Sequence, residues 1–190
     1  MLASLAGALS SGGSPGVAFL PQGGHGWLSR ELTAAGVPVD YFKLERPFSH
    51  RFARELAASF RRHRIDLAHG HEFTMAFYGA WAAHKAGVPH VITMHGSRYY
   101  ADRLRRRLAM RFAVGVSGCT VAVSEQLAAH MRRDLHVGFT RVAVVPNGVA
   151  PPPPPVPTLR AELGLTPADR LLLAVGSLYP VKGHRFLVDA

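Results

Sequence analysis

Short apolar runs alternate along this chain with longer stretches that have helical periodicity. The runs that we predict as strands are Val17–Leu20, Val37–Leu44, Asp66–His69, His90–Met94, Thr120–Val123, Val142–Val145 and Leu171–Val175. Most are rich in Val, Leu or Ile and alternate only weakly with polar residues, which is typical of strands covered on both faces. Because strands and helices alternate, the sequence predicts an α/β fold with a doubly wound, Rossmann-like parallel sheet.

Amphipathic helices are predicted between these strands. Two of them carry an apolar residue at every fourth position, a spacing that favours a stripe facing a core. The stripes are Phe52, Leu56 and Phe60 in one helix, and Leu104, Leu108 and Phe112 in an Arg-rich helix around 102–113. Another helix is expected around Leu2–Leu9, and Ser124 is predicted to cap the helix that follows it.

Pro151–Pro155 is an uninterrupted run of prolines. Proline fixes φ and has no N–H donor, so such a run favours an extended, semi-rigid connector. We therefore predict a first domain at 1–150, a Pro-rich linker at 151–157 and the start of a second domain at 158–190.

The chain is strongly basic, with 22 Lys and Arg against 12 Asp and Glu and a formal net charge of +10. Such a charge favours anionic partners. No RNA-binding signature, zinc-finger spacing or repeated basic-aromatic pattern accompanies it, so specific nucleic-acid binding is not predicted. Two interpretations stay open for Arg103 and Arg105–Arg107: a solvated helix face, or a surface that docks on anionic lipid.

The N-terminal residues are apolar but lack the basic segment of a signal peptide. No uninterrupted apolar run reaches the roughly 20 residues that a membrane span requires. We expect a cytoplasmic protein, with peripheral contact at the inner face of the membrane if the lipid interpretation holds.

Small and polar residues follow the predicted strands, and ligands of open α/β sheets bind beyond the carboxyl ends of strands. These residues are Gly70-His71, His95-Gly96, Ser124, Pro146-Asn147-Gly148 and Gly176-Ser177. Glycine lets a ligand approach the backbone, while His, Ser and Asn supply hydrogen-bond donors and acceptors. The pattern predicts a ligand-binding edge. His69 and His71 lack the spacing of zinc motifs, so no metal site is predicted.

Several strings resemble, in order and approximate spacing over residues 1 to 190, the GT-B glycosyltransferases of the GT4 type. In the first domain they are Ala68-His69-Gly70-His71, Gly87-Val88-Pro89-His90-Val91-Ile92-Thr93-Met94-His95-Gly96, Val121-Ala122-Val123-Ser124 and Val144-Val145-Pro146-Asn147-Gly148-Val149. After the linker, Val175-Gly176-Ser177-Leu178 with Lys182-Gly183 resembles the start of the family's donor-binding domain.

The resemblance implies an enzyme that transfers a sugar from a nucleotide-sugar donor to a carbohydrate or lipid-linked acceptor, with retention, no cofactor and no obligatory metal. His95 is implied as the catalytic histidine that reaches the transferred sugar. Lys182 would neutralise the donor diphosphate, and Gly183 would begin a helix whose amides add to phosphate binding. Gly176 and Ser177 would also bind the donor. The residues implied to line the cleft are Gly96, Ser124, Asn147 and Gly148.

Simpler interpretations stand beside these roles: a surface lysine for Lys182, a strand-end histidine for His95 and a turn residue for Asn147. The sequence also departs from the family pattern. Met1 falls inside the family's first helix, Ser177 stands where Arg is frequent, and Ala190 precedes the family's Glu-containing donor motif. We therefore expect a first domain that lacks its first strand, a segment 158–190 that packs poorly or against the first domain, and a fragment that is inactive alone.

Two alternatives to a transferase stay open. The first is a degenerate, non-catalytic domain that binds a partner or an anionic membrane through its basic face. The second is another GT-B enzyme that acts on a nucleotide sugar, such as an epimerase.

Overall fold

A computed structural model describes residues 16–21, 26–45, 47–96, 98–101, 103–148 and 158–190. The chain consists of two units, Met1–Val149 and Ala150–Ala190. The helix expected around Leu2–Leu9 and the predicted linker at 151–157 lie outside the described residues.

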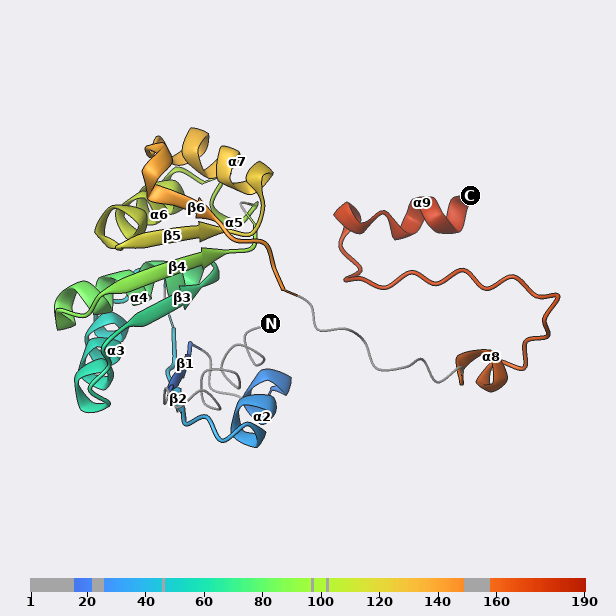
Figure 1. The fold of residues 1–190 in the computed structure, drawn as a ribbon, viewed down its shortest axis with the longest axis horizontal. Coiled ribbons are helices and arrows are strands. Elements are labelled where there is room, and N and C mark those ends of the chain that lie inside the picture. The colour runs from blue at the N-terminus through green and yellow to red at the C-terminus, as the bar shows by residue number, and fades with distance from the viewer. Residues whose placement is uncertain (1–15, 22–25, 46, 97, 102, 149–157) are drawn as a thin grey trace. The chain divides into compact units, whose positions relative to one another are not determined.

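The first unit contains parallel strands in two groups (Figure 1). β1 (Ala18–Leu20) pairs with β2 (Val39–Tyr41). The four-stranded sheet has the order β3-β4-β5-β6, and its strands are β3 (Ala68–His71), β4 (His90–Met94), β5 (Cys119–Ala122) and β6 (Val142–Val144). Every pairing is parallel, which confirms the α/β class with parallel strands.

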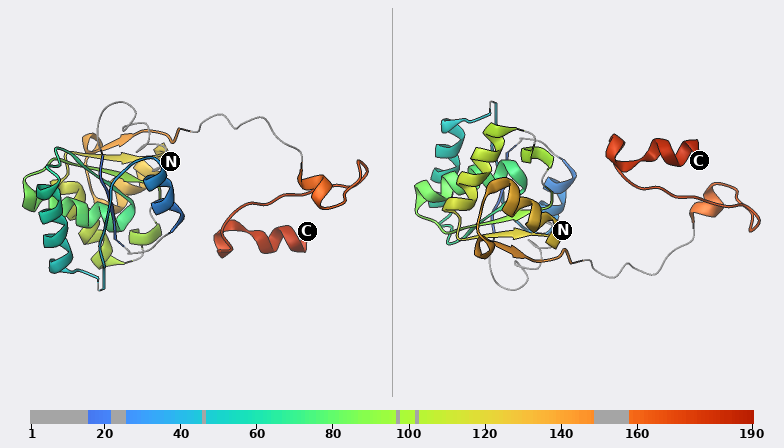
Figure 2. Two further views of the ribbon diagram at one scale, coloured as in Figure 1. Left: turned by 90° about the horizontal axis from the view of Figure 1, so that it is seen from below. Right: turned by 90° about the horizontal axis from the view of Figure 1, so that it is seen from above.

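The helices of this unit alternate with its strands. They are α2 (Trp27–Ala34), α3 (His50–Arg62), α4 (Glu72–Ala86), α5 (Arg98–Ala101), α6 (Leu104–Val116) and α7 (Glu125–Leu135), and the short helix η1 (Phe139–Arg141) precedes β6. α3 packs on α4, α4 on α6 and α6 on α7, so these helices form one layer (Figures 1 and 2). α4, α6 and α7 each lie between successive neighbouring strands of the four-stranded sheet, and right-handed crossovers place such helices on one face.

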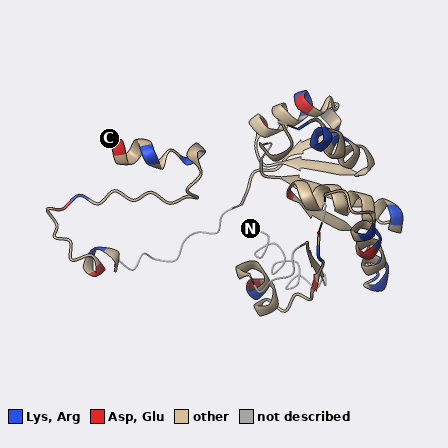
Figure 3. Cartoon of the chain, turned by 180° about the vertical axis from the view of Figure 1, so that it is seen from behind, with Lys and Arg blue, Asp and Glu red and all other residues tan. Residues whose placement is uncertain are grey.

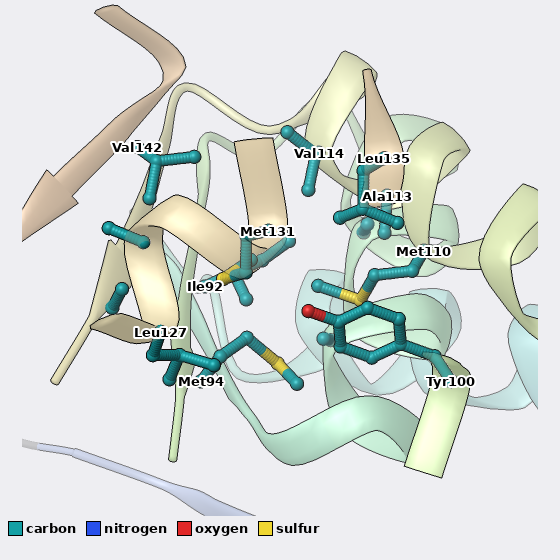
Figure 4. Packing of buried hydrophobic residues seen from close by; sticks show 14 residues of the cluster. Ile92, Met94, Tyr100, Met110, Ala113, Val114, Leu127, Met131, Leu135 and Val142 are labelled. Carbon is teal, nitrogen blue, oxygen red and sulfur yellow. The ribbon is translucent and has the colours of Figure 1, made fainter. Parts of the chain in front are cut away.

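Two apolar clusters form the core of the unit. In one, Ile92 and Met94 of β4 meet Met110 of α6 and Met131 of α7, with Tyr100 fully buried beside them (Figure 4). In the other, the buried residues Phe52, Leu56 and Phe60 of α3 pack with α4, as their spacing predicts.

Local sequence explains where the helices begin and end. Ser49 caps α3 by accepting a hydrogen bond from Phe52 N at 3.2 Å, and Ser124 caps α7 by accepting one from Leu127 N at 3.2 Å. The predicted cap at Ser124 is therefore confirmed. α4 ends at Gly87, whose φ of 72° lies in the left-handed region that glycine adopts without strain.

The two-stranded group is attached to α3 by aromatic and ionic contacts. Phe19 of β1 packs edge-on against Phe60, with ring centroids 5.0 Å apart. Asp40 of β2 accepts hydrogen bonds from Ser59, from Arg62 at 2.9 Å and from His63 at 3.0 Å. Burial raises the pKa of this carboxyl, but these bonds lower it more, so the net pKa lies below the ordinary value.

Two predictions were wrong. Leu104, Leu108 and Phe112 do not face the core: they are exposed, and α6 buries Ala109, Met110, Ala113 and Val114 instead. The spacing of apolar residues predicts a stripe on the helix but does not show that this stripe faces the core. The small side chains of Ala109 and Ala113 let that side of α6 approach its neighbours closely. Leu171–Val175 is not a strand, because among the described residues no neighbouring strand supplies it with hydrogen-bond partners.

The second unit consists of short elements in its described part. They are α8 (Leu159–Glu162), the short helix η2 (Pro180–Lys182) and α9 (His184–Asp189). Large apolar side chains are exposed throughout, including Leu172 at 83% and Val175 at 89%. None of the side chains described in 158–190 is buried.

Candidate functional site

A very tight turn joins β3 to α4. β3 ends at His71 and α4 begins at Glu72, whose φ of 59° lies in the left-handed region that non-glycine residues seldom adopt. A Cβ on Gly70 would lie 2.6 Å from the carbonyl oxygen of Met75, so the close approach of strand and helix requires glycine there. Strained residues of this kind gather at ligand sites, and this one directly follows a strand end.

A buried histidine fixes the spacing between this strand and helix. The Nε2 atom of His90 would lie 2.9 Å from a Cβ on Gly70 and 2.8 Å from a Cβ on Gly79. Ser117 Oγ donates its proton to the carbonyl of Ala113, so the 2.7 Å bond from His90 Nδ1 to Ser117 Oγ is donated by the ring. Burial, and then the nearby His69, lower the pKa of His90 to about 4. The ring is therefore neutral at neutral pH.

Three more histidines meet at the carboxyl ends of β3 and β4, and we call them the histidine cluster: His69, His71 and His95. The rings of His69 and His71 have centroids 4.3 Å apart, and those of His71 and His95 stack at 5.7 Å. His71 Nδ1 lies 3.4 Å from His95 Nε2. His69 Nε2 bonds Thr93 Oγ1 of the neighbouring strand at 2.8 Å.

Two members of the histidine cluster, His69 and His71, are biased towards their uncharged forms. Burial, followed by the neighbouring imidazoles of His69 and His95, lowers the pKa of His71 to about 4. Burial and then His95 also lower the pKa of His69. Neutral imidazoles each offer one donor and one acceptor, which suits hydroxyl groups better than it suits an anion.

The other residues predicted to line a cleft in this unit lie along the same edge. Because Met94, Ala122 and Val144 are in register across β4, β5 and β6, the residues that follow them emerge side by side. Gly96 follows β4, while Ser124 follows β5 and uses its hydroxyl to cap α7. Asn147 and Gly148 follow β6 and are exposed.

The residues predicted to bind the donor lie in the second unit. Lys182 ends η2 and is exposed. Gly183, with φ 69°, is the N-cap of α9. Gly176 and Ser177 lie in the irregular segment before η2, where the Ser177 carbonyl accepts a hydrogen bond from His184 Nε2 at 3.1 Å.

Sequence reasoning predicted a role for His95 but missed its contact with His71. Both histidines stand at predicted strand ends, and the parallel order of β3 and β4 was the signal that could have joined them. The left-handed φ of Glu72 has no such signal, since glutamate gives no hint of that conformation.

No group of three or more His, Cys, Asp or Glu side chains that could hold a metal ion occurs among the residues the structure describes. In the same residues, no helix combines the length and apolar character needed to cross a bilayer.

Comparison with known protein families identifies the family of this chain. The family model for Glycosyltransferase Family 4 matches residues 5–151. The chain belongs to this family, and the GT4-type resemblance is thereby confirmed.

A curated relative and several solved structures agree with the assignment. The uncharacterized glycosyltransferase MJ1178 of Methanocaldococcus jannaschii is 28% identical over 130 residues, which cover 66% of this chain and 33% of the relative. The chain thus spans about a third of the length of that relative.

Among solved structures, a Rickettsia africae glycosyltransferase aligns with a TM-score of 0.56 at 17% identity, covering 76% of this chain and 38% of that one. Anabaena Alr3699/HepE, in complex with UDP and glucose, aligns at 0.59 and 18%, covering 78% and 50%. S. aureus MnaA, in a structure with UDP, aligns at 0.55 and 18%, covering 75% and 40%. At these identities the similarity establishes the fold, which is the predicted Rossmann-like class.

Proposed function

We propose that the first unit is the acceptor-side domain of a retaining glycosyltransferase that uses a nucleotide-sugar donor, and that 158–190 opens its donor-binding domain. The observation that carries the proposal is the histidine cluster at the carboxyl ends of β3 and β4, in which burial favours the uncharged forms of His69 and His71, in a chain of Glycosyltransferase Family 4. Uncharged imidazoles can hydrogen-bond the hydroxyls of a sugar without repelling the oxocarbenium-like charge that develops as its bond to the diphosphate breaks.

His95 is the residue that we propose to contact the transferred sugar, and its hydrogen bond with His71 sets its tautomer. Nε2 of His71 is buried with no hydrogen-bond partner in the described part of the chain, and an unpaired N–H there would be costly. We therefore assign the proton of neutral His71 to Nδ1, which donates to Nε2 of His95. His95 then carries its proton on Nδ1 and presents it to a sugar oxygen.

The donor diphosphate is proposed to bind residues of the second unit. When the bond from the anomeric carbon to the diphosphate oxygen breaks, its electron pair leaves on the diphosphate, and the ammonium of Lys182 offsets the added charge. Backbone groups of Gly176, Ser177 and Gly183 would contact the same phosphates. Alr3699/HepE and MnaA have been solved with UDP, which makes UDP-sugars the first donors to test.

The acceptor is proposed to be a carbohydrate or a lipid-linked saccharide that enters beside Gly96, Ser124, Asn147 and Gly148. These positions lie on the edge of the sheet where the histidine cluster lies. We propose a cytoplasmic protein that makes peripheral contact with the inner face of a membrane.

Binding measurements on matched variants test the proposal. Saturation-transfer NMR with UDP-glucose, UDP-N-acetylglucosamine and GDP-mannose should show one nucleotide sugar that its own nucleoside diphosphate displaces. Lys182→Ala and His95→Ala should each weaken that binding at least about tenfold, the loss expected of a charged or buried hydrogen bond. Lys43→Ala and His130→Ala, which alter residues outside the proposed site, should not. Equal binding by all four variants would remove the assignment of Lys182 and His95.

A further inference from the structure

The outward side of α6 is apolar, although it faces solvent. Leu104 is 62% exposed, Leu108 57%, Phe112 40% and Val116 37%, and their spacing of four places them in one stripe along the helix. We call these four residues the α6 stripe. A surface helix of a globular domain normally has the opposite arrangement, with its large apolar residues inward.

Aromatic residues extend the apolar surface beside the α6 stripe. Phe112 contacts Phe77 with ring centroids 6.1 Å apart, and Phe77 in turn contacts Phe48 at 5.5 Å. Phe48 is 46% exposed, so the exposed apolar surface continues beyond α6. The buried ring of Phe77 lies between Phe48 and Phe112 and contacts both. Contiguous apolar surface of this kind marks a place that binds a protein or a membrane.

Positive charge borders the α6 stripe on both sides. α6 contains Arg105, Arg106, Arg107 and Arg111 and no acidic residue. Arg105 and Arg111 are exposed, as is Arg103 just before the helix, and among the described residues none of these three forms an ion pair.

The remaining two arginines are held by the fold. Arg106 stacks over the Tyr99 ring at 4.0 Å and donates to the Tyr99 carbonyl at 3.0 Å, while Arg107 is partly buried. The cations available to a partner are therefore Arg103, Arg105 and Arg111. Figure 3 marks where Lys and Arg lie along the ribbon.

We infer that α6 docks the protein on an anionic membrane, with the α6 stripe among the acyl chains and Arg103, Arg105 and Arg111 at the lipid phosphates. Charge complementarity selects this occupant, because an apolar stripe on a helix whose own charged residues are all arginines matches both the acyl chains and the phosphates of an anionic lipid surface. A second copy of this chain would instead place arginines opposite arginines. The inference deepens the proposed function by naming the surface at which a lipid-borne acceptor would be met.

Vesicle sedimentation without any nucleotide sugar tests docking separately from sugar transfer. The wild-type chain should bind vesicles of phosphatidylcholine with phosphatidylglycerol and bind pure phosphatidylcholine far less. Leu108→Gln should weaken binding roughly tenfold, because partial burial of a leucine side chain in lipid is lost. Leu67→Gln is the matched control, since Leu67 is 58% exposed and lies outside α6. Circular dichroism will show whether each variant remains folded.

Charge variants and the oligomeric state complete the test. Arg105→Gln with Arg111→Gln should lower binding and flatten its dependence on salt, whereas Arg54→Gln with Arg141→Gln should do so much less. The inference is overturned if anionic vesicles do not bind the wild-type chain, or if Leu108→Gln and Leu67→Gln bind equally. It is also overturned if sedimentation velocity shows a dimer that Leu108→Gln converts to a monomer.

Discussion

His90 shows how a single buried side chain couples the stability of this domain to pH. An unfolded histidine takes up a proton near its ordinary pKa of 6.5, whereas His90 in the fold does so only at about 4. Between these values the unfolded state binds more protons, so the free energy of unfolding decreases as the pH falls. His90 alone accounts for up to roughly 3 kcal/mol of that decrease.

Urea unfolding near pH 7 and near pH 4.5 measures this loss together with that of His71, whose pKa is also lowered to about 4. The window is distinct from that of Asp40, whose pKa lies below its ordinary value of 3.8 and whose contribution is lost at lower pH still. An unfolding free energy that stays constant between the two conditions would show that His90 and His71 are both accessible to protons in the folded state.

The hydrogen bond between His71 and His95 determines which ring nitrogen of His95 carries its proton. In ¹⁵N-histidine spectra, His95 should carry its proton on Nδ1, the tautomer that a free imidazole disfavours. His71→Asn should preserve this tautomer, because the asparagine amide nitrogen takes the place of Nδ1, whereas His71→Ala should return His95 to the Nε2 form. A wild-type His95 already in the Nε2 form would rule out the assigned hydrogen bond.

Helix α4 illustrates why an element cannot be judged from residue preferences alone. Glycine inside a helix normally costs about 1 kcal/mol relative to alanine, and α4 contains Gly79. There a Cβ would lie 2.8 Å from His90 Nε2, and that ring is pinned by Ser117. Gly115 of α6 has nothing within 4 Å of its Cβ position.

The two glycines should therefore respond with opposite signs. Gly79→Ala should lower the free energy of unfolding by about 1–3 kcal/mol through overpacking, while Gly115→Ala should raise it by about 0.5–1 kcal/mol. Thermal and urea unfolding of both variants provide the comparison. If Gly79→Ala also stabilises the domain, His90 does not fill the space between β3 and α4.

Most elements of the first unit could be predicted from sequence, because their periodicity and caps are local. β4 has the predicted bounds, and α3 buries the predicted stripe. The prediction of which side of α6 faces the core was wrong, because that side depends on the neighbouring elements, and a spacing of four residues does not identify them. Leu171–Val175 has the composition of a strand, but a strand also needs partners.

The candidate site also has features that could be predicted from the sequence and features that could not. Strand-end position pointed to His95 directly, since polar residues after an apolar run are visible in sequence. The contact from His71 to His95 depends on the register of β3 and β4, and the lowered pKa of His71 depends on burial. Neither is encoded by nearby residues.

At the scale of the whole molecule, the two units differ in how much of each is buried. The first has two apolar clusters, whereas no side chain described in 158–190 is buried. Limited proteolysis should therefore cut within 158–190 well before it cuts between β3 and β6, because cleavage follows local opening. Protection of 158–190 equal to that of the first unit would contradict this expectation.

The central claim is that the histidine cluster binds the sugar of a nucleotide-sugar donor. The most direct measurement is a titration of the ¹⁵N-histidine-labelled chain with UDP-glucose and the other nucleotide sugars, with resonances assigned from His71→Asn and His95→Ala. We predict that one donor shifts the ring signals of His71 and His95 and leaves those of His63, His130 and His136 in place. Saturable binding of a donor with no change at His71 or His95 would contradict the account.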